Sequence, residues 1–167
     1  GVQTCALPIL KKPWSGTGPG KAVSMALNNS TLARFMALFN ETRPDVDALM
    51  DECYSTGVRF RDPLVEKHGK EALAAYLRDA YTNVTRCRFD YGQPLISGDS
   101  ATLTWTMTLE HRRLARGRPI HVEGITLLQG DESGIHYHRD YYDAGQLIYE
   151  NVPLLGSIIR RIRRQAA

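Results

Sequence analysis

The chain has 167 residues, 43% of them hydrophobic and 23% charged, which is enough apolar material for one domain with its own core. The formal net charge is +3, but all seven cations of residues 1–24 and 156–167 lie in segments that contain no acidic residue, and without them residues 25–155 carry −4. Since the positive charge lies at the two ends, the composition argues against a nucleic-acid-binding surface on the folded body, and we expect no nucleic-acid partner.

No apolar run approaches the roughly 18 residues that cross a membrane, and no charged segment followed by an apolar one resembles a secretory signal. The three cysteines, Cys5, Cys53 and Cys87, are odd in number and lack the spacing of a metal site. We therefore expect reduced thiols and a cytoplasmic protein.

The first nine residues, GVQTCALPI, resemble a translated adaptor from the sequencing of environmental DNA. The next fifteen residues are rich in Gly, Pro, Ser and Lys and show no apolar period. Residues 1–24 are therefore predicted to be a disordered tail, with Met25 as the true start and residues 25–145 as the folded domain.

The first half of the domain predicts three helices and one strand. Ser30 and Thr42 each precede apolar residues at helical spacing, and Gly57 should end the second helix. Residues 58–63 (VRFRDP) predict a short strand, 66–70 (EKHGK) a turn, and 70–83 a third helix. The apolar residues expected on the buried sides are Leu32, Phe35, Met36 and Phe39, then Val46, Leu49, Met50 and Cys53, then Leu73, Tyr76, Leu77 and Ala80.

The second half predicts antiparallel strands joined by turns at ARGR (115–118) and GDESG (130–134). The stretch 100–109 alternates strictly, with threonines on one side of the strand and apolar residues on the other. Those apolar residues are Ala101, Leu103, Trp105, Met107 and Leu109. Helices followed by a run of strands indicate the α+β class.

The last predicted strand contains HYHRDYYD, residues 136–143, in which almost every side chain can donate, accept or titrate. Alternation should place His136, His138, Asp140 and Tyr142 on one side. The first three of these could hold a metal as an open three-ligand site, but no second cluster of ligands accompanies them, so we expect no metal. Asp143 should cap a helix that follows.

The order helix–helix–strand with FRDP (60–63), the helix start at Gly69–Leu73 (G-x-EAL), and a meander that ends in HRDYYD are similar to the nuclear-transport-factor-2-like superfamily, above all its SnoaL-like branch, which includes polyketide cyclases. The likeness spans residues 30–145 and continues into LIYENVPLLGSIIRRIRR, a tail associated with bacterial SnoaL-like proteins. It implies a cone-shaped, curved antiparallel or mixed sheet with helices on its concave face, an apolar cavity, and a homodimer formed through the sheet.

This scaffold hosts isomerases, cyclases, epoxide hydrolases, dehydratases and binding proteins, so the resemblance does not fix the reaction. It matches Asp140 to an aspartate that helps to activate water in limonene epoxide hydrolases, and it places Phe60 and Asp62 at the cavity wall. Those hydrolases also need an Arg and an Asp on the central strand, where this chain has Trp105 and Met107. Epoxide hydrolysis is therefore kept only as a further alternative.

The leading hypothesis is acid–base catalysis without a cofactor, with Asp62, His138 and Asp140 as catalytic residues. An apolar setting and a second carboxylate raise a carboxyl pKa, so that one group is a base and the other a donor, as in ketosteroid isomerase. Such a pair suits isomerisation or cyclisation of a small hydrophobic carbonyl compound. The expected substrate-binding residues are Tyr54, Phe60, Trp105, Met107 and Tyr142.

Two alternatives remain open. Asp140 could pair with Arg59, Arg61 or a histidine and only fix the sheet, in a module that binds a small molecule or lipid. The segment 146–167 is predicted to form a basic amphipathic helix, either a lid over the cavity, which we favour, or an extension that touches a membrane surface. A protein that interacts through this helix would expose its apolar side, which contains Leu154, Leu155, Ile158, Ile159 and Ile162.

Overall fold

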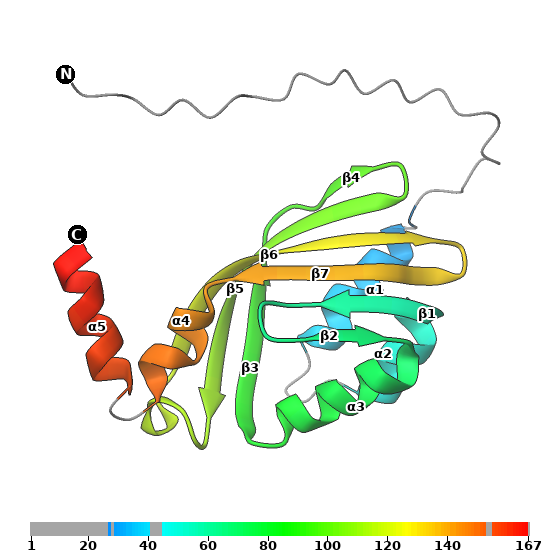
Figure 1. Ribbon diagram of the computed structural model, residues 1–167. Coiled ribbons are helices and arrows are strands. Elements are labelled where there is room, and N and C mark those ends of the chain that lie inside the picture. Colours follow the sequence, from blue (N-terminus) through cyan, green and yellow to red (C-terminus); the bar gives the residue numbers. More distant parts are fainter. Residues whose placement is uncertain (1–26, 28, 41–44, 153–154, 167) are drawn as a thin grey trace, which may run out of the picture.

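The computed structural model describes residue 27 and residues 29–40, 45–152 and 155–166 (Figure 1). Its centre is a curved, unclosed sheet in the order β2-β1-β7-β6-β5-β3, with β4 paired to β5. Among the described strand pairs, β1 with β7 is parallel and the others are antiparallel. The strands are β1 Tyr54–Arg61, β2 Glu66–His68, β3 Val84–Tyr91, β4 Leu95–Ser97, β5 Ser100–His111, β6 Ile120–Asp131 and β7 Gly134–Tyr142.

Three helices, α1 Asn29–Phe39, α2 Val46–Cys53 and α3 Lys70–Tyr81, lie along the part of the sheet that contains β1 and β2 (Figure 1). After β7 come the short helix α4 Ala144–Leu147, the 3-10 turn η2 Tyr149–Asn151 and the helix α5 Leu155–Ala166, and a further turn, η1 Ala115–Gly117, links β5 to β6. The predicted α+β class and the mixed, curved sheet are confirmed. The tail predicted for residues 1–24 lies outside the described residues.

The element boundaries differ from the prediction where α1, α2 and β1 begin. Ser30 lies inside the first turn of α1, which starts one residue earlier. The N-cap of α2 is Asp45, whose carboxylate accepts the backbone N–H groups of Asp47 and Ala48 at 3.1 and 3.0 Å, while the predicted start at Thr42 lies outside the described residues. Gly57 does not end this helix but lies inside β1, because the chain passes directly from α2 into its pairing with β7.

The segment 66–70, predicted as a turn, contains strand β2, which pairs with β1. The link between the two strands is built by Asp62, whose Oδ1 accepts the backbone N–H groups of Leu64 and Val65, both at 2.7 Å. An aspartate that binds the backbone two and three residues ahead fixes a tight turn, so three polar residues can pair as a strand. In α3, Ala80 is exposed rather than buried.

Alternation on β7 is interrupted at His136. Gln129 of β6 pairs with Tyr137, whereas the next residue, Gly130, pairs with Ile135, so His136 is the extra residue of a β-bulge. Ile135 and His138 consequently both point inward, with 0% and 2% of their surface exposed, and His136 is exposed. The prediction that His136 shares a side with His138 was wrong, and in the described part of the chain no group of three His, Cys, Asp or Glu could hold a metal.

The core consists of two clusters that follow the inward row of β5, and the predicted burial of that row is confirmed. The first cluster joins α1, α2 and α3 to the sheet through residues such as Leu103, Leu128 and Ile135. The second contains Trp105, Met107 and other side chains of β3, β5 and β6 beyond these helices, and Tyr142 and Leu147 pack against it. A cavity can therefore remain between these two clusters where no helix packs.

Gly124 of β6 is required by the packing of Trp105, its direct partner on β5. A Cβ atom at Gly124 would overlap the indole ring of Trp105. We therefore expect Gly124→Ala to lower the free energy of unfolding by about 1–3 kcal/mol, the usual cost of overpacking, in urea denaturation. Gly57→Ala is the matched control, since a Cβ there meets nothing within 4 Å, and an equal loss in both variants would contradict this account.

Candidate active site

A cavity of about 360 Å³ opens between the two clusters and is walled by α1, α3, α4 and strands β1, β3, β5 and β7. Its wall is mostly aliphatic and aromatic, and polar atoms enter it at few points. The structure brings all eight sequence-predicted site residues to this one cavity: Tyr54, Phe60, Asp62, Trp105, Met107, His138, Asp140 and Tyr142.

The polar centre of the wall is a chain of hydrogen bonds through His138 and Asp140. The Tyr54 hydroxyl lies 2.7 Å from Nδ1 of His138, and Nε2 of the same ring lies 3.0 Å from Oδ1 of Asp140. The Thr126 hydroxyl donates to this same Oδ1 at 2.5 Å and accepts the indole N–H of Trp105 at 2.8 Å. Five side chains from β1, β5, β6 and β7 thus form one connected network.

The direction of each hydrogen bond follows from two groups of this network, one of which can only donate and the other only accept. An indole N–H can only donate, so the hydroxyl of Thr126 accepts from Trp105 and donates to Asp140. A carboxylate can only accept, so His138 presents Nε2–H to Asp140 and leaves Nδ1 to accept from the hydroxyl of Tyr54. In this arrangement each N–H and O–H donor of the chain has an acceptor.

Asp140 is held through one oxygen. Both of its described hydrogen bonds end on Oδ1, while the side chain keeps 20% of its surface exposed and lines the cavity. By contrast, the neighbouring ring of His138 is packed edge-on against Phe35 and Phe60, with centroids 5.4 and 4.9 Å apart. The ring of His138 is thus held in place by packing, and of the two cavity-lining groups the Asp140 carboxylate is the more exposed.

Asp62 is bound quite differently from Asp140. Besides the two backbone N–H groups of its turn, it accepts the hydroxyl of Tyr76 at 2.7 Å and that of Tyr142 at 3.3 Å, both on Oδ2. Four donors therefore occupy its two oxygens, and no hydrogen bond between described residues joins it to Asp140. Asp62 is an acceptor that orients two phenols, and the donors on this side of the cavity are Tyr76 and Tyr142.

The phenols keep their protons at neutral pH. Burial raises the pKa of Tyr142 well above its ordinary value, and the nearby carboxylate of Asp62 raises it further. Burial likewise raises the pKa of Tyr76, and so does its hydrogen bond to Asp62. The cavity thiol of Cys87 is also neutral, because burial raises its pKa to about 11, which makes it a poor nucleophile.

Sequence reasoning did not identify Thr126, and it treated Tyr76 only as a core residue. Thr126 stands in the inward row of β6 between Gly124 and Leu128 and is 3% exposed. A lone hydroxyl in an apolar row is a detectable signal, since a buried polar group needs partners. For Tyr76 the signal is weaker, because a tyrosine on the apolar side of a helix is also typical of ordinary core packing.

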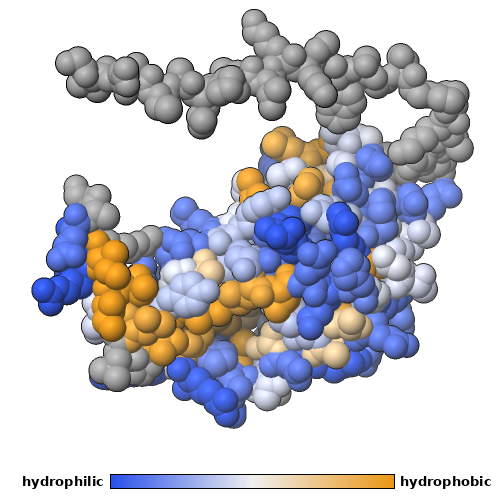
Figure 2. Space-filling model, viewed as in Figure 1, coloured by the Kyte–Doolittle hydropathy of each residue, from blue (hydrophilic) through white to orange (hydrophobic). Residues whose placement is uncertain are grey.

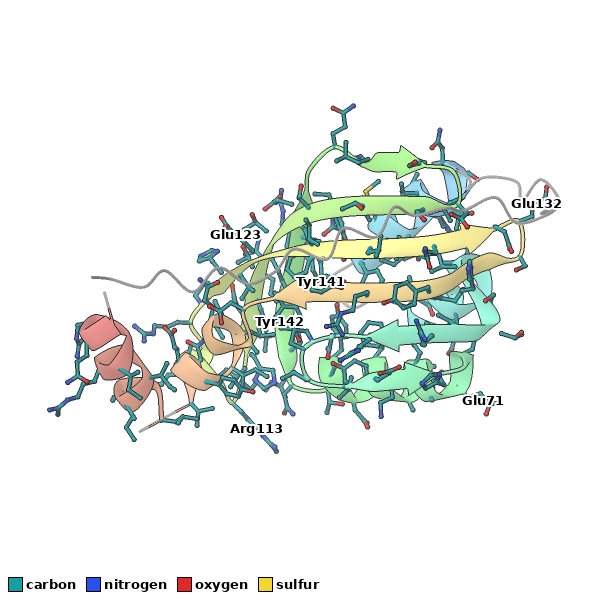
Figure 3. All side chains as sticks on the ribbon, turned by 45° about the horizontal axis from the view of Figure 1, so that its top comes forward. Glu71, Arg113, Glu123, Glu132, Tyr141 and Tyr142 are labelled. Atoms are coloured by element: carbon teal, nitrogen blue, oxygen red, sulfur yellow. The ribbon has the colours of Figure 1, made fainter. Side chains whose placement is uncertain are left out.

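The cavity is closed at one end by α4 and by the residue after it. Leu147 and Ile148 line the wall, and the Asp143 carboxylate caps α4 by accepting the N–H groups of Gly145 and Gln146, as predicted. Figure 3 shows α4 directly beside the end of β7, where Tyr142 lies. No described residue of α5 lines the cavity. Of the segment 146–167, for which a lid was one prediction, the described residues that line the cavity are Leu147 and Ile148.

Comparison with known proteins agrees with this architecture. A family model of the SnoaL-like domain matches residues 32–135. The chain belongs to the SnoaL-like family. No protein of curated function matches it in sequence.

Solved structures resemble this SnoaL-like protein over most of their length. A protein from Catenulispora acidiphila with a ketosteroid isomerase-like fold, in complex with trimethylamine, has a TM-score of 0.65 at 15% identity, covering 76% of this chain and 96% of its own. A protein from Shewanella putrefaciens assigned as a SnoaL-like polyketide cyclase has 0.60 at 16%, covering 71% and 90%. An epoxide hydrolase of the LEH-like type from M. tuberculosis has 0.57 at 16%, covering 70% and 83%. At these identities the likeness shows a shared fold.

We expect the hydroxyl of Thr126 to be essential to the network. Thr126→Val keeps the shape but removes the acceptor of the Trp105 indole and one donor to Asp140. Leaving such buried groups without partners should lower the free energy of unfolding by about 1–3 kcal/mol, measured by urea denaturation. Thr56→Val, at an exposed position of β1, should change it by less than about 0.5 kcal/mol; equal effects would show that the network adds nothing.

Proposed function

We propose that this SnoaL-like protein removes a proton from the carbon beside the carbonyl group of a small hydrophobic compound, with Asp140 as the general base and no cofactor. The observation that carries the proposal is the position of Asp140, a carboxylate fixed through Oδ1 at the wall of an apolar cavity. A base held in place in this way needs no reorganisation before it reacts.

His138 and Thr126 act on the reaction through Asp140. Their hydrogen bonds hold Oδ1, so the carboxylate cannot rotate freely, and Oδ2 is the oxygen with no described hydrogen bond. Tyr54 in turn fixes the ring of His138. In this proposal His138 is a positioning residue, and Asp140 alone takes the proton.

The phenol of Tyr142 is the proposed donor to the substrate oxygen. Its hydrogen bond to Asp62, at 3.3 Å, is long, so the hydroxyl can turn toward a ligand at little cost. The raised pKa of Tyr142 keeps it a donor throughout the neutral range. Asp62 would then act by orienting this phenol and that of Tyr76, and not as a proton donor itself.

The reaction is balanced within these groups. Asp140 takes the proton from the carbon, the C–H electrons form an enolate, and the hydroxyl of Tyr142 donates a hydrogen bond to the enolate oxygen. Where the substrate has a double bond between its β and γ carbons, the enolate is a dienolate, and return of the proton from Asp140 to the γ carbon moves the double bond and completes an isomerisation. Attack of the enolate carbon on a second carbonyl group completes a cyclisation, with the proton passing to the new alkoxide.

The shape of the cavity supports a hydrophobic substrate. Phe60, Trp105 and Met107 supply apolar wall, and the indole N–H of Trp105 is already bound to Thr126, so this residue offers a ligand its ring and not a donor. The apolar pair Trp105 and Met107 also argues against water activation by the route of limonene epoxide hydrolases, which needs charged groups there.

The proposal can be tested before the natural substrate is known. Removal of the proton beside a carbonyl group lets deuterium from D₂O enter that position, which NMR detects in a simple ketone such as cyclohexanone. We expect the wild type to accelerate this exchange. Asp140→Asn keeps Oδ1 as an acceptor for both of its partners but removes the base, so exchange should fall by about 100-fold or more, with an unchanged melting temperature and ketone affinity.

Asp90→Asn, an exposed carboxylate on β3, is the matched control and should exchange at the wild-type rate. If the ketone binds but the wild type does not accelerate exchange, the cavity belongs to a binding module and the catalytic proposal fails. The same conclusion follows if Asp140→Asn and the wild type exchange equally fast.

We also propose that the protein forms a homodimer through the sheet face opposite the cavity. Thr104, Ile125 and Tyr141 are direct neighbours across β5, β6 and β7 on this face, and Ile125 and Tyr141 are 37% and 51% exposed. An exposed isoleucine beside an exposed tyrosine in the middle of the sheet is a suitable centre for an interface.

A charge in the centre of that face should separate the subunits. We expect Ile125→Glu to raise the dimer dissociation constant at least about tenfold in sedimentation velocity, since burying an unpaired carboxylate costs more than 1.4 kcal/mol. Ile96→Glu on β4, where the isoleucine is 42% exposed, should leave it unchanged. A monomeric wild type would refute the proposal.

A further inference from the structure

The helix α5 carries an apolar side that the described structure leaves open. Leu155, Ile158 and Ile162 are 39%, 57% and 55% exposed, although their spacing of three and four residues places them on one side of the helix. The helix contacts mainly the turn η2 and stands apart from the sheet in Figure 1. Three exposed large aliphatic side chains at neighbouring positions form the kind of apolar patch that marks an interaction site.

The charges of α5 indicate what kind of surface would cover this patch. The sequence places four arginines between residues 160 and 164 and no acidic residue after Glu150. Of these, Arg161 and Arg164 are exposed. With 3.6 residues per turn, Arg161 falls beside the apolar side and Arg164 opposite it. An apolar stripe with cations at its flank and on its back is the pattern of a helix that lies in the interface of an anionic membrane.

We propose that α5 attaches the protein to the surface of an anionic lipid bilayer. The aliphatic side would enter the boundary between headgroups and acyl chains, and the arginines would lie at the level of the lipid phosphates. No helix in the described part of the chain is long and apolar enough to cross a membrane, so this attachment concerns the membrane surface.

A lipid surface fits better than a groove on a protein, because the apolar surface extends beyond the helix. Figure 2 shows hydrophobic surface that continues from α5 over α4 toward the β1–β2 turn, where the surface is hollowed. Leu64 of that turn and Tyr149 of η2 are 40% and 44% exposed. A planar interface can cover a helix and the apolar body beside it together, whereas a helix-binding groove covers the helix alone.

The attachment would also bring the cavity to the lipid. Leu147 and Ile148 line the cavity just before η2 leads into α5, and the exposed Leu64 lines it as well. A hydrophobic ligand could then pass between bilayer and cavity without crossing bulk water. This inference concerns the source of the ligand and is independent of the chemistry proposed for Asp140.

The test is sedimentation of the full chain with vesicles of phosphatidylcholine alone and of phosphatidylcholine with phosphatidylglycerol. We expect binding to the anionic vesicles, which weakens as salt is raised. Ile158→Asp with Ile162→Asp removes the apolar side, and Arg161→Glu with Arg164→Glu reverses two charges. Each pair should lower the partition coefficient at least about tenfold, since each basic residue near such a surface contributes about a fivefold factor.

Matched controls lie on the body of the protein. Leu95→Asp with Ile96→Asp alters two exposed aliphatic residues of β4, and Arg86→Glu with Arg88→Glu makes the same change in net charge on β3. Both pairs should bind like the wild type. The proposal is refuted if the wild type ignores anionic vesicles, if the α5 pairs bind as well as it does, or if these pairs only abolish self-association in sedimentation velocity, which would identify a second copy as the partner.

Discussion

The candidate site depends on the hydrogen bond between His138 and Asp140. It joins a fully packed ring to a carboxylate at the cavity wall, so that the core of the protein determines where the carboxylate lies. Because Nδ1 of the ring accepts from Tyr54, the tautomer that donates to Asp140 is the one the network selects. The packing of the first core cluster thereby fixes the position of Oδ1, while Oδ2 has no described hydrogen bond.

The bulge at His136 is the backbone feature that lets β7 direct both Ile135 and His138 into the core. His136 is the extra residue on β7, opposite the step from Gln129 to Gly130 on β6. Without it, Ile135 and His138 could not both point inward. Ile135 closes the core beneath α2, while His138 begins the polar row that continues to Asp140 and Tyr142. One irregular residue thus lets the same strand contribute an apolar anchor at its start and the polar groups of a cavity at its end.

The sequence could predict whatever depends on local periodicity. Strict alternation identified the inward row of β5, and helical spacing identified α1 and α3, because the apolar pattern in each case is set by one element alone. It could not predict the bulge at His136 or the strand β2, because both depend on pairing with a distant strand. Strand alternation and the family resemblance together pointed to candidate site residues such as His138, Asp140 and Asp62, but not to their separate roles. The folded chain shows that four donors surround Asp62, whereas both described hydrogen bonds of Asp140 end on one oxygen.

The different hydrogen bonding of Asp62 and Asp140 changes the chemistry expected of the site. A shared proton between Asp62 and Asp140 would require the two groups to face each other, yet each is engaged by its own set of donors. In the proposed mechanism the hydrogen-bond donor is then a phenol, Tyr142, whose proton burial retains at neutral pH. Because Asp62 also fixes the turn between β1 and β2, the orientation of that phenol is tied to the same backbone turn that shapes the cavity rim. In the proposal, base and donor both lie on β7, but they are fixed by different neighbours: Asp140 by His138 and Thr126, and Tyr142 by Asp62, which follows β1.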